Sequence, residues 1–342
     1  MKKIGFACKW IDNPSQVAGI KPTDNAKQYN TGTTTISWLN RQTKDVAEQK
    51  LWDLMVQNIE AVRKLVSKVA TLDPHLRMVR IGSDILPAYT HANWSYFWQR
   101  RDVIDYLESR FSVVGNIARA NNVRLSMHPG QFVVLASINP GIVERSIEEF
   151  EYHATMARMM GYGKSFQDFK INVHISGKLG PDGIRTAYKQ LSQEARNCIT
   201  IENEENSWGI NDCLSISDIV PIVLDIHHHW IREGEYLDPN DARVKRVVDS
   251  WRGLRPTMHY SVSREDYLVG HDSLIAPVHA QLLLDGYKKQ KLRAHSDFYW
   301  NNETNKWAIT FLNQFDIMCE SKGKNLASME LYNQAKNYLE SN

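Results

Sequence analysis

Eight short apolar segments alternate along this chain with longer segments that have the spacing of amphipathic helices. The apolar segments, each short enough for a buried parallel strand, cover residues 3–9, 77–82, 124–128, 171–176, 198–203, 221–226, 257–262 and 316–321. Helices are expected at Val46–Val69, Val103–Ala120, Ile142–Met160, Arg185–Ala195 and Leu326–Leu339. Such alternation is typical of a parallel sheet covered by helices.

Eight units of one strand and one helix predict an α/β fold, and specifically a closed (β/α)8 TIM barrel. A doubly wound open sheet would produce a similar pattern and stays as the alternative. The segments 10–42 and 263–312 follow neither pattern, so we expect them to be loop insertions. A chain of 342 residues, 42% of them hydrophobic, can bury one large core, and we expect a single domain over residues 1–342.

Composition excludes few classes of protein. The formal net charge is 41 − 39 = +2, which allows a polyanionic partner without requiring one. The four cysteines are scattered and form no C-x-x-C pair, so buried thiols are expected rather than disulfides or zinc ligands. Lys9 interrupts the apolar start before a signal-peptide core could form, and no later segment has membrane-spanning length. We therefore expect a cytoplasmic protein with no membrane contact. A monomer is expected as well, although the sequence does not settle the oligomeric state.

Histidines and carboxylates gather where the predicted strands end, which is where a barrel of this kind carries its functional side chains. These residues are His128, His174, Glu202, Asp225, His227, His228, His229, His259 and Glu320. Any one of them could be an ordinary polar residue near a strand end. Three carboxylates in one barrel mouth would repel one another, however, unless cations lay between them.

Imidazole together with carboxylate suits zinc, manganese or iron. The candidate ligands exceed what one ion can use, so we expect at least two ions with a bridging carboxylate. Paired ions favour phosphodiester cleavage as the reaction. A sugar isomerase of the same barrel type stays open as an alternative. Spacing does not show which of His227, His228 and His229 is a ligand.

Six motifs together resemble the UV damage endonucleases, a family of metal-dependent barrels related to endonuclease IV. They are MHPGQF (127–132), HISGK (174–178), IENEE (201–205), DIHHH (225–229), RPTMHYS (255–261) and CESKGK (319–324), and the likeness extends over essentially the whole chain. The resemblance implies a TIM barrel and a cluster of divalent ions, of the manganese type, with zinc as the other candidate. It also implies incision of damaged double-stranded DNA immediately 5′ of UV photoproducts. A DNA-damage binder without catalytic activity is the second alternative.

The resemblance also implies roles for particular residues. One ion would be held by His128, His174 and Glu202, a second by Glu202, Asp225, His259 and Glu320, and a third by His228 and His295. The predicted catalytic residues are Glu202, Glu320 and His91, with His91 near the scissile phosphate. One position departs from the family, in which a carbamate-modified lysine often lies two residues before the histidine that matches His259. Here Thr257 occupies that place, and a threonine cannot be carboxylated, so the third ion would be held differently.

Contacts with DNA are expected at the ends of three of the strands and in one basic segment. Gln131 and Phe132 match the family's wedge pair, which enters the duplex where the damaged bases leave the stack; a Phe packed under the barrel rim is the alternative. The segment 287–307 interleaves cations with aromatic rings, which suits phosphates and unstacked bases, although a solvated helix and a packed loop would look the same. The predicted DNA-binding residues are Gln131, Phe132, Lys9, Trp10, Lys178 and Arg293.

Overall fold

Eight parallel strands form the centre of the protein in a computed structural model, which describes residues 1–18 and 23–340. The strands are β1 (Ile4–Cys8), β2 (Met78–Ile81), β3 (Arg124–Met127), β4 (Lys170–His174), β5 (Ile199–Glu202), β6 (Ile222–Val223), β7 (Thr257–Tyr260) and β8 (Asp316–Cys319). Each lies inside the segment predicted for it, apart from Lys170, which extends β4 by one residue. All eight predicted strands are therefore confirmed.

The sheet is nearly closed into a barrel. The strand order is β6-β5-β4-β3-β2-β1-β8-β7, and neighbouring strands in this order run parallel. The two edge strands meet through a parallel bridge between Asp225 and His259, and the His259 N–H donates to the Leu224 carbonyl at 2.9 Å. This contact supports the closed (β/α)8 barrel over the open sheet.

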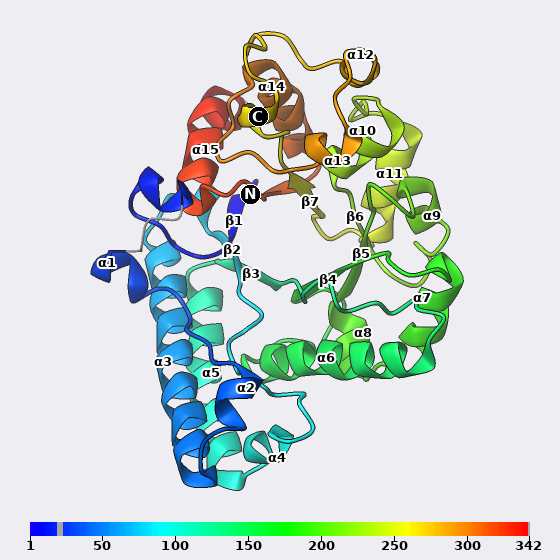
Figure 1. The fold of residues 1–342 in the computed structure, drawn as a ribbon. Coiled ribbons are helices and arrows are strands. Elements are labelled where there is room, and N and C mark those ends of the chain that lie inside the picture. Colours follow the sequence, from blue (N-terminus) through cyan, green and yellow to red (C-terminus); the bar gives the residue numbers. More distant parts are fainter. Residues whose placement is uncertain (19–22, 341–342) are drawn as a thin grey trace.

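Helices surround the strands (Figure 1). The longer ones are α3 (Lys44–Ala70), α5 (Arg101–Ala120), α6 (Pro140–Met159), α7 (Gly180–Tyr188), α10 (Ile226–Glu233), α11 (Ala242–Ser250), α14 (Asn302–Thr310) and α15 (Lys324–Glu340). The short ones are α1 (Asp24–Lys27), α2 (Ile36–Leu39), α4 (Ser95–Trp98), α8 (Gln193–Cys198), α9 (Ile210–Leu214), α12 (His279–Leu284) and α13 (Lys289–Leu292). Gly115 of α5 packs so closely on the end of α6 that an added Cβ would lie 1.8 Å from the Met160 carbonyl oxygen.

Two predictions about helices were wrong. The segment Arg185–Ala195 is broken after Tyr188, because Ser192 caps a new helix by accepting from the Ala195 N–H at 3.2 Å. The segment 263–312 is not irregular throughout, since residues 302–310 form α14 behind the N-cap Asn301. In the segment 10–42, of which residues 19–22 lie outside the described residues, only short helical turns are found among the rest, so most of it is a loop insertion as predicted.

The four cysteines are free thiols in the described part of the chain. Cys198, Cys213 and Cys319 are buried, and Cys8 is half-buried at the end of β1. Among the described residues, no helix combines the length and the apolar character that crossing a membrane requires.

The opposite end of the barrel from the histidines is closed by one buried carboxylate. Asp316 begins β8 and accepts from the Lys3 N–H at 2.8 Å, from Arg124 Nη1 at 2.6 Å and from Arg255 Nε at 2.7 Å. These contacts tie three strand starts to the loop before β7. They position the barrel without touching the histidine end.

Candidate metal centre

Every predicted strand-end ligand lies at the mouth of the barrel. His174 and Glu202 are the last residues of β4 and β5, and His259 lies within β7. His128 and Glu320 directly follow β3 and β8. Since parallel strands end at one edge, side chains from residues as far apart as 128 and 320 are brought together.

The ligand candidates form two compact groups that share one residue. The groups are His128, His174 and Glu202, and Glu202, Asp225, His259 and Glu320. Within each, one ligand atom per residue lies within 4.8 Å of the others. The division matches the first two predicted ion sites residue for residue.

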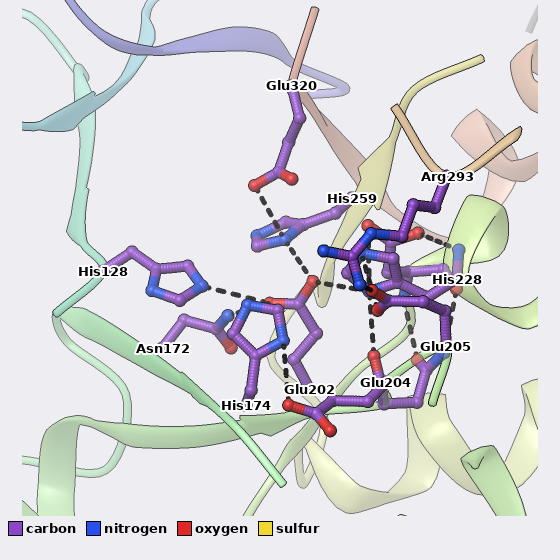
Figure 2. Close-up of polar contacts among 12 residues, drawn as sticks. His128, Asn172, His174, Glu202, Glu204, Glu205, His228, His259, Arg293 and Glu320 are labelled. Carbon is purple, nitrogen blue, oxygen red and sulfur yellow. Dashed lines mark hydrogen bonds and ion pairs between the residues drawn. The ribbon is translucent and has the colours of Figure 1, made fainter. Parts of the chain in front are cut away.

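Glu202 directs its two oxygens to different groups (Figure 2). Oε2 lies 3.3 Å from His128 Nε2 and 3.9 Å from His174 Nε2. Oε1 lies 3.0 Å from His259 Nδ1, which is in turn 3.2 Å from Glu320 Oε1. A carboxylate placed in this way can bridge two ions.

The electrostatics of these carboxylates differ. Burial alone would raise the pKa of Glu202, but the charges of His259 and His174 lower it well below its usual value. Burial likewise opposes ionisation of Glu320, and Arg80, which donates to Oε1, lowers its pKa well below normal. Burial raises the pKa of Asp225 well above its usual value, because the opposing charge of His228 is too weak.

Asp225 tests whether the residues fit a divalent ion. Its Oδ1 accepts from the His228 N–H at 2.7 Å, whereas Oδ2 is buried without a hydrogen-bond partner among the residues described. A buried carboxylate oxygen without a partner is costly, and a cation beside it would remove that cost. The mixed imidazole and carboxylate donors therefore fit ions of the zinc or manganese type.

Lys170 lies beneath this site and was not predicted. Its Nζ is 3.1 Å from His259 Nε2, and burial lowers the pKa of Lys170 to about 7. A neutral amine can accept the Nε2–H of His259, which leaves the Nδ1 lone pair facing Glu202 and Glu320 for an ion. The only sequence signal was the alternation along β4, which places Lys170, its first residue, on the same face as His174.

The three consecutive histidines follow Ile226 in the first turn of α10 and have three different environments. Asp225 is the N-cap of this helix, and Gly234, at φ 78°, ends it. His228 faces the centre, with Nδ1 3.5 Å from Glu202 Oε1. His229 points away and lies 3.0 Å from Glu235 Oε1. His227 is buried beside His295, with ring centroids 5.9 Å apart.

The third predicted ion site is less compact. The rings of His228 and His295 are 6.4 Å apart between centroids, and the two residues belong to neither compact ligand group. Asp225, Glu202 and Glu205 raise the pKa of His228 to about 9, although burial opposes this. Thr257 lies on the same strand as His259, and its buried Oγ1 has no hydrogen-bond partner within residues 1–18 and 23–340.

Phe132 projects into solvent at the barrel mouth, four residues after His128. Its side chain is 84% exposed, and the adjacent Gln131 is exposed as well, so the alternative of a Phe packed under the rim was wrong. The pair lies between two cavities that share Gly130 to Val133. One, of about 400 Å³, contains His128 and His174, and the other, of about 870 Å³, contains Cys8 and Lys9.

The other predicted DNA-binding cations lie around this mouth. Lys9 and Lys178 are exposed. Arg293 is also exposed and lines the smaller cavity, where its Nη1 lies 3.0 Å from Glu205 Oε1. His91, predicted to be catalytic, is half-buried in the loop after β2, and its Nδ1 accepts from the Asn93 N–H at 3.2 Å.

Two expectations about aromatic rings are corrected. Trp10 is buried, with its ring 5.9 Å from those of Phe6 and Tyr29, so it is a core residue and cannot stack on DNA bases. In the segment 287–307, Tyr299 is buried against Tyr260 at 4.9 Å. Trp300 and Trp307 also pack inward, each donating its indole N–H to a backbone carbonyl. Lys288, Lys291, Arg293 and Lys306 of this segment are exposed, whereas Lys289 is half-buried and donates to the Arg232 carbonyl. The rings of Tyr299, Trp300 and Trp307 therefore do not form the exposed platform that was expected.

A sequence model of one family, described as UV-endonuclease UvdE, matches residues 5–342. The chain belongs to this family. The match covers the whole barrel and both ligand groups, so the resemblance inferred from the motifs is confirmed.

Curated relatives have related names. The chain is 32% identical over 213 residues to a putative UV-damage endonuclease of Acanthamoeba polyphaga mimivirus, covering 59% of this chain and 63% of that protein. It is 28% identical to the UV-damage endonuclease of Schizosaccharomyces pombe, covering 81% of this chain and 43% of that longer protein. The match thus spans less than two thirds of each of these two relatives. The UV DNA damage endonuclease of Bacillus cereus is 25% identical, with 88% of each chain covered.

Two solved structures share the fold. A structure titled SacUVDE superposes with a TM-score of 0.70 at 21% identity, covering 100% of this chain and 99% of that one. Endonuclease IV from Thermus thermophilus gives a TM-score of 0.52 at 12% identity, covering 82% of this chain and 95% of that one. At these identities the likeness establishes the barrel fold alone.

Proposed function

We propose that this member of the UvdE family is a metal-dependent DNA-repair endonuclease that hydrolyses the phosphodiester immediately 5′ of a UV photoproduct. Cyclobutane pyrimidine dimers and 6-4 photoproducts are the proposed lesions, with abasic sites as a further substrate. The ions are two or three divalent cations, manganese by preference and zinc as the alternative. The names of the curated relatives support this assignment.

The observation that carries the proposal is the position of Glu202. Its two oxygens face two ligand groups, and the mouth that holds them opens beside an exposed Phe132. A compact sugar site would have no use for an exposed aromatic ring at its edge. The complete ligand set also disfavours a binder without catalytic activity.

The chain's own residues would prepare the site for an in-line displacement. When bound, paired ions lower the pKa of an attacking water and stabilise charge on the attacking and leaving oxygens. His128 and His174 with Glu202 hold one position, and Asp225, His259 and Glu320 hold the other. Arg80 fixes Glu320, and Asn172 donates to Glu202, so the shared carboxylates are oriented before substrate arrives.

Incision of defined duplexes tests the proposal. An end-labelled duplex with one cyclobutane dimer would be incubated beside an undamaged and an abasic duplex, with manganese and with a chelator. The proposal predicts a nick immediately 5′ of the dimer that needs the metal, with the undamaged strand intact. If protein of confirmed metal content cut none of the three duplexes, sugar substrates of the same barrel type would be the next to test.

Replacing the exposed ring tests how the lesion is selected. We expect Phe132→Ala to slow incision of the dimer duplex about tenfold or more, because stacking of a base on an aromatic ring contributes ~1–3 kcal/mol. Ile138→Ala is the matched control, since Ile138 is 61% exposed in the same loop and has no predicted role. Equal single-turnover rates for the two variants would remove Phe132 from lesion recognition.

A further inference from the structure

The barrel mouth is divided by charge. The two ligand groups come from the ends of β3 to β8. The remaining sector, from β1, β2 and the start of α15, carries three cations, Lys9, Arg80 and Lys324. Lys9 is exposed and lines the larger cavity beside Gln131 and Phe132, and Arg80 is already paired with Glu320.

Lys324 has no counterion of its own. It is half-buried and lies four residues after Glu320, yet its Nζ has no hydrogen bond or ion pair with any residue that the structure describes. Burial, with the nearby charges of Arg80 and Lys9, lowers the pKa of Lys324, although Cys8 and Glu320 act in the opposite direction. The nearby carboxylate of Glu320 is engaged by Arg80 and His259.

The backbone conformation of Lys324 is also unfavourable. Lys324 has a φ of 49°, a left-handed conformation that an L-residue other than glycine adopts at an expense of ~1 kcal/mol or more. It is also the first residue of α15, where the helix dipole disfavours a cation. A glycine would serve the backbone better at this position. The amine of Lys324 therefore lies at this position at a cost to stability.

We propose that Lys324, together with Lys9, binds a phosphate of the damaged strand next to the scissile one. The inference rests on the proposed function, because it takes DNA as the substrate. A phosphate between Lys324 and Lys9 would supply the anion that both amines lack. A strand held there would run from the metal centre along the cavity that Phe132 borders, so the contact would set which bond meets the ions.

Two variants separate binding from folding. Lys324→Met removes the charge, and Lys324→Gly removes the charge while relieving the left-handed φ. We expect both to bind a cyclobutane-dimer duplex about tenfold more weakly, with a slope of log affinity against log salt that is shallower by about 0.9. Lys324→Arg should restore most of the binding. Lys322→Met is the control, since exposed Lys322 lies 3.9 Å from Asp297 and should keep wild-type affinity.

Neutral methylphosphonates, placed at one phosphate after another in the damaged strand, would locate the contact. The wild-type protein should lose affinity at a phosphate flanking the incision, and Lys324→Met should lose no more at that position. If the wild type incises the duplex but Lys324→Met and Lys324→Gly keep its affinity and salt slope, the inference about Lys324 alone is overturned. If the wild type does not incise, the proposed function fails and this inference with it.

Discussion

Replacing Glu202 by glutamine is expected to reduce incision of a dimer-containing duplex by about 1000-fold or more. Glutamine keeps the volume of the side chain and can still accept the hydrogen bond from Asn172. It lacks the charge and the second anionic oxygen that the two ligand groups share. Ions in such sites supply several kcal/mol of charge stabilisation, and ~4 kcal/mol corresponds to about 1000-fold in rate.

The control for this variant is Glu204→Gln, two residues further along the chain. Glu204 lies 4.0 Å from His174 Nδ1, outside both ligand groups, and burial followed by the charge of Glu205 raises its pKa to about 7. We expect Glu204→Gln to keep its metal and to lose less than tenfold in rate. Single-turnover incision and metal analysis would be measured on the same samples. A Glu202→Gln protein within tenfold of wild type would refute the bridging role.

Replacing Asp316 by alanine is expected to lower the free energy of unfolding by about 3 kcal/mol. The carboxylate is buried and accepts from the Lys3 N–H and from two arginines, Arg124 and Arg255. Its loss would leave these donors without their acceptor at the closed end of the barrel. Both arginines keep about a quarter of their surface exposed, so water can satisfy part of what is lost, and we take the lower end of the usual range.

Urea unfolding followed by circular dichroism would measure this effect. Asp316→Asn should fall between wild type and alanine, because an amide oxygen can still accept from the Lys3 N–H but carries no charge for the arginines. A loss below about 1 kcal/mol in Asp316→Ala would show that the network contributes little to stability. Incision per folded molecule should stay near wild type, because the network lies at the far end of the barrel from the two ligand groups.

The strands and the two ligand groups could be predicted from the sequence because both depend on short runs of neighbouring residues. A buried parallel strand is a short apolar run, and the residue that ends it must lie at the barrel mouth, as Glu202 and His174 do. The helix break at Ser192 was harder to predict, since the cap competes with an otherwise continuous helical pattern. Asn301 is a typical N-cap residue and could have indicated the start of α14, but the segment around it has no regular helical or strand pattern.

Contacts between distant segments could not be predicted. Trp10 follows a strand as a DNA-facing residue might, and only the position of Tyr29 in the insertion shows that its ring is buried. Lys170 contacts His259 across the barrel interior, which depends on the register of strands 89 residues apart. The exposure of Phe132 likewise depends on the loops around it and not on its own motif.

We propose that two ions, bridged by Glu202, perform the incision. The most direct test titrates manganese into metal-free protein and records, in the same samples, bound ions per chain and the rate of nicking 5′ of a single cyclobutane dimer. We predict that nicking is absent without metal and reaches its full rate only as the second ion binds. Full nicking with one ion bound, or with none, would contradict the account.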